Sequence, residues 1–317
     1  MLMTRSISIA YAAGLTVLAP GLACGQDFPT RPIRILTGAA GGSADFASRQ
    51  LAQGLTVRLG QQVIVDNRSV VATDIVAKAP PDAYSLLLDG GSFWIAPLLQ
   101  DTPYDVVRDF SPISSVITSP NVLVVHPSVA ANSVKDLIAL AKAKPGALNF
   151  ASSGTGGSSH LSGELFKAMA GVNMVHVPFK GSGAALASQL AGEAQLQFSP
   201  AATAAPHVKS GRLRALAATT AQPSPLAPGL PTVAATLPGY EAIQILGIFA
   251  PAKTPTARIN RLSHEIVQIL KQREVIDQLA GFGMEATGSA PEELAATLKT
   301  EIAKWGKLIK DAGVRAN

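Results

Sequence analysis

Three short segments of the chain combine glycine with hydroxyl side chains, and these residue types can bring several hydrogen-bond donors to one anion. Glycine lets the main chain approach a ligand closely, and serine and threonine hydroxyls add donors. The candidate ligand-binding residues are Gly41, Gly42, Ser43 and Asp45 in the first segment, Ser153, Gly154, Thr155, Ser158, Ser159 and His160 in the second, and Lys180, Gly181 and Ser182 in the third. Lys180 is the one cation among them, and Asp45 can brace its loop as readily as touch a ligand. Together the segments predict a cleft for a carboxylate or a phosphate.

Each segment lies between a predicted strand and a predicted helix. The strands are residues 33–36, 148–150 and 174–177, and the helices that follow are residues 47–59, 158–170 and 182–190. The first of these helices is expected to end at Gly60, because glycine is favoured just after a helix. The first backbone N–H groups of a helix have no partner within the helix, and the helix dipole favours negative charge there. In an open α/β sheet the ligand crevice lies at the carboxyl ends of the strands. The three segments are therefore expected to share one site.

The rest of the chain repeats the same alternation of strands and helices. Further strands are predicted at residues 63–65, 86–88, 195–198, 215–218 and 243–249, and further helices from Ser133 and at residues 259–270, 274–279 and 291–309. Ser133 is expected to cap its helix as part of a capping box with Asp136. The strands at residues 63–65 and 86–88 are apolar throughout, which is typical of burial on both faces in parallel sheets. The pattern predicts an α/β fold with open, mostly parallel sheets. At about 150 residues per domain, the length indicates two domains.

Known catalytic and cofactor motifs are incomplete in this sequence. Residues 154–159 resemble a dinucleotide-binding G-x-G-x-x-G, but no Asp or Glu follows at about 20 residues to hold a ribose. Neither a P-loop nor a G-x-S-x-G nucleophile elbow occurs. The five histidines, at positions 126, 160, 176, 207 and 264, have no metal-binding spacing. We expect no catalytic residue, no cofactor and no metal; an exported serine esterase that pairs Ser43 or Ser159 with His160 is an alternative.

Charged residues are scarce and evenly spread. The 317 residues include 26 Lys and Arg against 21 Asp and Glu, a formal net charge of +5, and only 15% of residues are charged. No Lys- or Arg-rich run occurs, and the 5% of aromatic residues are too few for a base-stacking platform. The basic balance therefore does not indicate nucleic-acid binding.

The first 25 residues have the pattern of a secretory signal peptide. Arg5 is followed by a short apolar run that ends at Pro20, and small residues come next. Cleavage after Gly25 leaves no cysteine in the mature chain, whereas cleavage after Ala23 places Cys24 first, where it could carry a lipid. The residues before Cys24 match the lipoprotein pattern poorly, so we expect an exported, periplasmic protein without a lipid anchor.

A series of short motifs runs in order through nearly the whole chain after residue 25. They include residues 29–36 (PTRPIRIL), 41–45 (GGSAD), 160–166 (HLSGELF), 174–183 (MVHVPFKGSG), 211–217 (GRLRALA) and 304–310 (KWGKLIK). In this order the motifs resemble the Bug (TctC) family, the periplasmic solute-binding proteins of tripartite tricarboxylate transporters.

The resemblance implies a flytrap fold of two α/β domains that close on a ligand. One domain would take residues 26–122 and 247–317, and the other residues 123–246. The three segments above and the later Ser199 would bind a small organic acid, such as a di- or tricarboxylate or an aromatic carboxylate. The implied partners are the membrane subunits of a tripartite tricarboxylate transporter, and the implied state is a monomer. A protein that signals ligand binding to a membrane sensor kinase would need the same cleft.

Two positions depart from the family pattern. After Arg68, the family usually has a glycine-rich segment at the edge of the cleft, but here the chain reads Ser69-Val70-Val71-Ala72-Thr73 and is about four residues shorter. The usual Phe-Asp-Asn is replaced by Phe198-Ser199-Pro200. Loss of that acid removes a partner for an ammonium group, so the resemblance predicts a ligand without an amino group.

Overall fold

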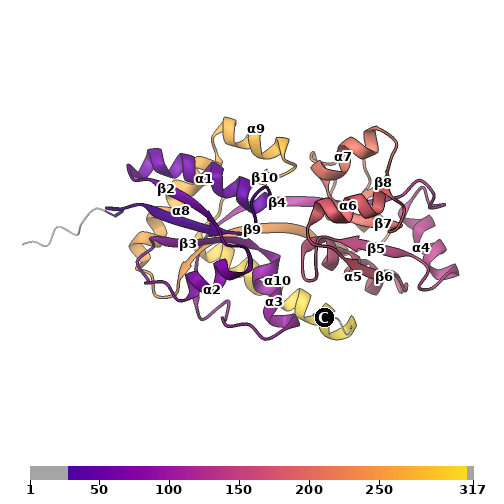
Figure 1. The fold of residues 1–317 in the computed structure, drawn as a ribbon, viewed down its shortest axis with the longest axis horizontal. Coiled ribbons are helices and arrows are strands. Elements are labelled where there is room, and N and C mark those ends of the chain that lie inside the picture. The colour runs from indigo at the N-terminus through magenta and orange to yellow at the C-terminus, as the bar shows by residue number, and fades with distance from the viewer. Residues whose placement is uncertain (1–27, 313–317) are drawn as a thin grey trace, which may run out of the picture.

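The computed structural model describes residues 28–312 and confirms the α/β fold. Two lobes lie beside each other along the long axis of the molecule, and strands β4 (Phe110–Val125) and β9 (Ile243–Pro251) run between them (Figure 1). The expected signal peptide, residues 1–25, lies outside the described residues together with Cys24. The expected domain boundaries at residues 122 and 247 fall on β4 and β9 and stay a prediction.

The first lobe has its sheet in the order β2-β1-β3-β9-β4. Its strands are β1 (Ile33–Thr37), β2 (Val63–Asn67), β3 (Ser85–Gly90), part of β9, part of β4, and the short edge strand β10 (Glu285–Ala286). Strand β1 is parallel to β2 and β3, whereas β9 is antiparallel to β3 and β4. Alternate side chains enter different cores, since Ile35 and Leu86 pack with one set of helices and Leu36 and Leu87 with another. Both faces of this sheet are therefore covered.

The helices of the first lobe divide between those two faces. Helix α1 (Ser43–Leu59), α8 (Thr256–Leu270) and α9 (Arg273–Gly281) cover one face. The other face is covered by α2 (Ala72–Ala77), α3 (Gly91–Leu99) and α10 (Pro291–Ala312). A short 3-10 turn (Ser69–Val71) precedes α2. Helix α1 ends as predicted at Gly60, whose φ of 66° is left-handed and favours glycine.

The second lobe has the strand order β4-β7-β5-β6, with β8 on the other side of β4. The strands are β5 (Asn149–Ser152), β6 (Val175–Pro178), β7 (Leu196–Pro200) and β8 (Arg214–Ala218). The helices are α4 (Val134–Ala143), α5 (Ser158–Ala170), α6 (Ser182–Leu190) and α7 (Ala201–Lys209), and a 3-10 turn lies at Val233–Ala235. The buried rings of Phe150, Phe166 and Phe198 lie in the core of this lobe.

Strand β4 was not predicted, because Pro112 and Pro120 interrupt the apolar pattern that marks a strand. Its first part pairs with β9 up to Pro120, and its last five residues pair with β7 and β8. The register shifts between Pro112 and Ser114 and again between Ser115 and Ile117, so that β4 carries one extra residue at each of the two irregularities. Because β4 and β9 add antiparallel pairs, both sheets are mixed, with parallel pairing confined to the strands of the β-helix-β units.

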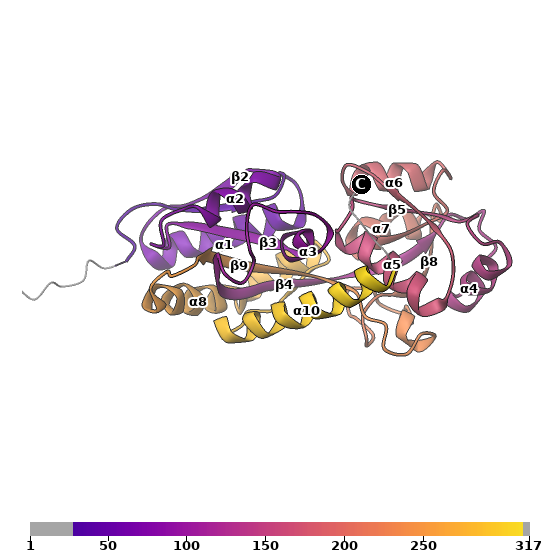
Figure 2. The ribbon, with the colours of Figure 1, turned by 90° about the horizontal axis from the view of Figure 1, so that it is seen from below.

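Helix α10 extends along both lobes. It packs against β4 and reaches α3 in one lobe and α5 in the other, and Figure 2 shows it running beneath the strands. Trp305 is buried, and its indole N–H donates to Glu301 Oε2 at 2.6 Å. The last helix therefore contacts the helices that follow two of the loops discussed below.

Close approach of α5 to β5 depends on a glycine inside the helix. A Cβ at Gly163 would overlap the ring of Phe150, which is fully buried and has no room to move. We expect Gly163→Ala to lower the free energy of unfolding by about 1–3 kcal/mol, because overpacking outweighs the gain in helix propensity. Denaturant unfolding followed by circular dichroism measures this change.

Gly306 is the matched control, because it lies inside α10 and a Cβ there meets nothing closer than Leu98 at 3.8 Å. Gly306→Ala should raise the free energy of unfolding by up to about 1 kcal/mol. Equal effects of the two substitutions would contradict the close packing of α5 on β5.

Candidate functional site

Loops from both lobes open onto one cavity of about 570 Å³. This volume lies in the range of sites that bind small molecules, which is about 300–1,000 Å³. The lining residues are Gly38, Ala39, Ala40, Gly41, Gly42, Ser43 and Ala44 at the start of α1, Asp89, Gly90, Gly91 and Ser92 at the start of α3, Ser153, Gly154, Thr155, Gly157 and Ser158 at the start of α5, Gly181, Ser182 and Gly183 at the start of α6, and Gln244 and Leu246 of β9. The structure therefore brings together the three segments predicted from sequence and adds a fourth.

The four helices that start at the cavity all have a glycine as N-cap. These residues are Gly42, Gly90, Gly157 and Gly181, and none makes a side-chain hydrogen bond to its helix. By contrast, Ser133 caps α4 away from the cavity and accepts the N–H of Asp136 at 3.1 Å, as predicted. A glycine N-cap leaves the first N–H groups of its helix without a side-chain acceptor. Those donors and the helix dipoles make this edge of the cavity attractive to an anion.

Asp45 stabilises the first loop and does not itself line the cavity. Its carboxylate accepts from the Gly41 N–H and from Asn67 Nδ2, both at 2.9 Å, and pairs with Arg49 at 2.9 Å. Burial by itself raises the pKa of Asp45, but these bonds and the Arg49 charge lower it overall. Asp45 was expected either to brace its loop or to touch a ligand, and these contacts favour bracing.

Ser43, the first residue of α1, makes contact with the crossing strand. Its hydroxyl lies 3.1 Å from Nε2 and 3.3 Å from Oε1 of Gln244 on β9. Gln244 was not predicted as a site residue, because it lies on a strand and not in a glycine-rich loop. Its signal is nevertheless visible, since it is the one polar side chain in the apolar run from Ile243 to Phe249.

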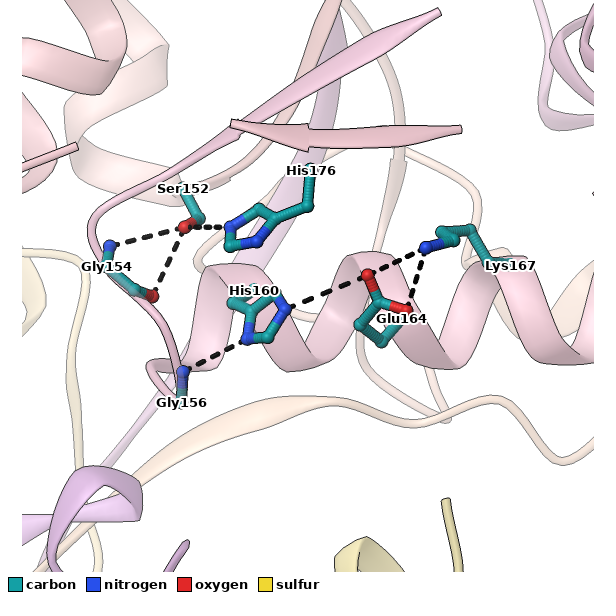
Figure 3. A network of polar contacts seen from close by, with 7 residues as sticks. All are labelled: Ser152, Gly154, Gly156, His160, Glu164, Lys167 and His176. Atoms are coloured by element: carbon teal, nitrogen blue, oxygen red, sulfur yellow. Dashed lines mark hydrogen bonds and ion pairs between the residues drawn. The ribbon is translucent and has the colours of Figure 1, made fainter. Parts of the chain in front are cut away.

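The second loop rests on a polar network within the second lobe (Figure 3). The Gly156 N–H donates to His160 Nδ1 at 3.0 Å, and the Gly154 N–H donates to Ser152 Oγ at 3.2 Å. Ser152 Oγ also lies 2.6 Å from His176 Nε2. The rings of His160 and His176 stack with their centres 3.9 Å apart. The two histidines therefore hold the second loop in place from within the second lobe.

The same network ends in charged side chains on α5. Because Nδ1 of His160 accepts a hydrogen bond, its proton is on Nε2, which lies 3.7 Å from Glu164 Oε1. Lys167 Nζ donates to both carboxylate oxygens of Glu164 at 2.9 Å. The positive charge of Lys167 is thus paired with the carboxylate of Glu164 on the same helix.

Both histidines are neutral at neutral pH. Burial, with help from the neighbouring His176 and Lys167, lowers the pKa of His160 to about 3. Burial, with help from Lys167, lowers the pKa of His176 to about 4. The histidines therefore act as hydrogen-bonding supports, and the cavity gains no positive charge from them.

The third loop is tied to the second by backbone hydrogen bonds. The Phe179 N–H donates to the Ser152 carbonyl at 2.9 Å, and the Gly181 N–H donates to the Ser153 carbonyl at 3.1 Å. Gly181 has a φ of 98°, which favours glycine at this turn. Lys180 is exposed and is not among the residues that line the cavity, so the predicted cation does not face it in this conformation.

Three more predicted residues lie off the lining. Ser159 is buried, and its hydroxyl accepts the Ser153 N–H at 3.1 Å, so it shapes the second loop as His160 does. Ser199 is fully buried in the second sheet, where it faces Val122 of β4. Ser199 is not among the residues that line the cavity, so its role in binding stays a prediction. Residues 69–73 are also absent from the lining, so the shortened segment does not border this cavity.

The fourth loop, Asp89 to Ser92, was missed because α3 was not predicted. This helix is apolar on all sides and contains Pro97, so it has no helical period and carries a helix-breaking residue. The signal that could have found it is Gly90-Gly91-Ser92 directly after an apolar strand, the same pattern as in the other loops.

The arrangement does not favour the serine esterase. Ser43 contacts Gln244 and Ser159 contacts Ser153, while the ring nitrogens of His160 face Gly156 and Glu164. The Ser152–His176 pair is close, but Ser152 is fully buried. Residues 28–312 also contain no group of three or more His, Cys, Asp or Glu placed to hold a metal ion. The geometry thus offers hydrogen-bond donors rather than an activated nucleophile.

A cavity formed by loops of two α/β lobes, with two strands crossing between them, defines a two-lobed solute-binding protein. Residues 47–314 match the family model TctC, the tripartite tricarboxylate transporter family receptor, and the chain belongs to this family. The resemblance seen in the sequence motifs is thereby confirmed.

Curated relatives cover most of the chain. It is 35% identical to a UPF0065 protein in the tcbD-tcbE intergenic region of Pseudomonas sp., over 92% of this chain and 89% of the relative. It is 32% identical to protein BugT of Bordetella pertussis, over 99% of both chains.

Two solved structures are similar to this chain in fold and, more distantly, in sequence. An R. palustris protein solved with adipate has a TM-score of 0.83 and 33% identity, and the match covers 92% of this chain and all of that one. MatC from Rhodopseudomonas palustris, solved with bound malate, has a TM-score of 0.78 and 25% identity, over 89% of this chain and all of that one.

The buried histidines predict acid sensitivity. Because their pKa values are lowered in the folded protein, the unfolded chain takes up protons that the folded one does not as the pH falls below about 6.5. The free energy of unfolding should therefore fall by up to about 1.4 kcal/mol per pH unit for each of His160 and His176 until their folded pKa values are reached. Urea unfolding between pH 7 and pH 4 measures the slope.

In His160→Gln, the slope of the free energy of unfolding against pH should fall by the contribution of about one proton, because glutamine keeps an acceptor for the loop but does not titrate. His264→Gln is the control, since His264 is exposed on α8. An unchanged slope in His160→Gln, or an NMR pKa of His160 near its ordinary value, would show that the ring is not buried as described.

Proposed function

We propose that this protein is an extracytoplasmic solute receptor that binds a small organic carboxylate in the cavity and delivers it to a tripartite tricarboxylate transporter. The observation that carries the proposal is the set of four helices with glycine N-caps whose first turns border one cavity. Uncharged backbone donors at helix starts are a common way to hold a carboxylate. A receptor needs no catalytic group, and none is proposed.

The ligand class rests on the cavity and on the relatives together. The family is a transporter receptor family, and two members of this fold were solved with adipate and with malate. We propose that the ligand carboxylate is held by the loops at Gly41–Ser43, Ser153–Ser158 and Gly181–Ser182. Asp45, Ser159 and His160 act on the ligand through the loops that they support.

Closure of the two lobes would complete the site. The proposed hinge lies where β4 passes from one sheet to the other at Asn121 and where β9 begins at Ile243. With the boundaries expected from the sequence, residues 26–122 and 247–317 would move relative to residues 123–246. Closure would also give Lys180 a route to the ligand, since its neighbour Gly181 already lines the cavity.

The proposed location is the periplasm, with the mature chain starting after residue 25 and the membrane subunits of the transporter as partners. The pattern of residues 1–25 supports export. Among residues 28–312, no helix is long and apolar enough to cross the membrane. We propose a monomer in which the closed form is the one that the transporter recognises.

A thermal-shift panel of organic acids tests the binding function. A ligand at 100 times its dissociation constant stabilises the folded state by about 2.7 kcal/mol, which raises the melting temperature measurably. We expect stabilisation by one or more mono- or dicarboxylates and none by neutral analogues such as the amides. A panel in which no carboxylate stabilises the folded protein contradicts the proposal.

Ser158→Asp tests whether the carboxylate binds at the cavity. Ser158 is the first residue of α5, where an aspartate is compatible with the helix dipole, so the variant should fold. Its charge should weaken carboxylate binding at least tenfold, because like charges a few ångströms apart repel by about 4 kcal/mol near a protein surface.

Ser133→Asp is the matched control. It also places an aspartate at a helix start, at the N-cap of α4, where aspartate replaces serine well. Isothermal titration calorimetry should give the wild-type affinity for this variant. Equal weakening in both variants would show that the ligand binds elsewhere.

A further inference from the structure

The cavity contains an acid that neither the sequence motifs nor the proposed binding loops include. Among the described residues that line it, Asp89 is the one with an ionisable side chain. It lies at the carboxyl end of β3, directly before α3, and is half-buried. An acid in a site for carboxylates is unfavourable by simple electrostatics, so its presence needs an explanation.

Asp89 already accepts two donors at the start of its own helix. Oδ1 accepts the Gly90 N–H at 2.7 Å and the Ser92 hydroxyl at 3.1 Å. The starts of α1, α5 and α6 have no such internal acid on the cavity side. Each free helix start acts like roughly half a positive charge. The cavity therefore offers three helix starts to a ligand, while the fourth faces a resident carboxyl.

No nearby cation balances this carboxyl in residues 28–312, since none of the ion pairs there includes Asp89. Charged groups on the elements around β3 and α3 pair with each other: Arg34 with Asp66 on β1 and β2, Asp45 with Arg49 on α1, Asp74 with Lys78 at α2, and Glu301 with Lys304 on α10.

Tyr104 is the remaining titratable group that interacts with Asp89. Its hydroxyl donates to the Phe93 carbonyl, and burial together with the Asp89 charge raises the pKa of Tyr104 to about 12, so it stays neutral. Burial also raises the pKa of Asp89, although the bonds from Gly90 and Ser92 act in the opposite direction. Asp89 is thus predisposed to hold a proton when a second negative charge arrives.

We propose that Asp89 is a specificity-determining residue that limits the negative charge which the cavity accepts: a dicarboxylate binds together with one proton, held between Asp89 and the ligand, whereas a monocarboxylate binds without it. The protonated carboxyl then donates a hydrogen bond to the ligand instead of repelling it. Binding of dicarboxylates is therefore stronger at lower pH. This inference rests on the proposed carboxylate-binding function.

Calorimetry with adipate and hexanoate tests the inference, because these acids have the same chain length and differ by one carboxylate. Titrations between pH 6.5 and 8.5, in phosphate and in Tris, give the affinity and the number of protons taken up. Wild-type protein should take up close to one proton with adipate, and its adipate affinity should fall by up to tenfold per pH unit. Hexanoate should show a much smaller change.

Asp89→Asn keeps the acceptor for Gly90 and Ser92 but cannot titrate. It should bind adipate without proton uptake, with no pH dependence in this range, and at least tenfold more tightly than wild-type at pH 8.5. Asp101→Asn is the control, because it removes the same charge from an exposed residue outside the lining. It should behave as wild-type.

The outcomes separate this inference from the proposed function. If wild-type and Asp89→Asn bind adipate with the same affinity and proton uptake, Asp89 does not select the ligand charge, while carboxylate binding stands. Tight binding of aspartate or glutamate that Asp89→Asn abolishes would show instead that the ionised carboxyl holds an ammonium group. If neither protein binds any acid of the panel, both the inference and the proposed function are overturned.

Discussion

Backbone N–H groups at the first turns of α1, α3, α5 and α6 must find acceptors, and much of the site follows from this requirement. A buried N–H without a partner costs free energy comparable to a lost hydrogen bond, so helix starts are usually capped by a side chain. Here the N-caps are glycines that provide none. The starts of α1, α5 and α6 border a cavity, where an anion can accept their N–H groups. Because side chains do not cap these helices, their first N–H groups remain available to bind a ligand.

The fold brings these helix starts together through the two crossing strands. In each lobe the parallel strands direct their following loops to the same edge of the sheet. Strand β4 leaves the first sheet at Pro120 and enters the second at Asn121, and β9 runs antiparallel beside it. The loop edges of the two sheets therefore lie across one cavity, with Gln244 of β9 on its lining. Helix α10, which packs along β4 and contacts α3 and α5, links the same two edges from outside.

Local signals in the sequence were sufficient where a residue's neighbours along the chain decide its structure. The bounds of α5 and α6, the left-handed Gly60 and the Ser133 cap depend on periodicity and capping within a few residues, and all were predicted. Strand β4 and helix α3 depend on tertiary pairing and burial, which override their prolines, and both were missed. The fourth loop was not predicted because α3 was not, and the burial of Ser199 depends on the pairing of β7 with β4, which sequence order does not reveal.

Positioning residues and ligand-facing residues are also hard to separate from sequence, because both are polar and both lie in the same loops. Asp45, Ser159 and His160 stand beside the lining residues along the chain, yet their polar atoms point back to Gly41, Ser153 and Gly156. This division follows from the use of backbone donors: a main-chain N–H can be aimed at a ligand only if side chains fix the turn that carries it. A site built with lysine or arginine would place its specificity in flexible side chains. This site places it in the shape of the loops, and Asp89, the one ionisable side chain on the described lining, is where we propose that selectivity for ligand charge arises.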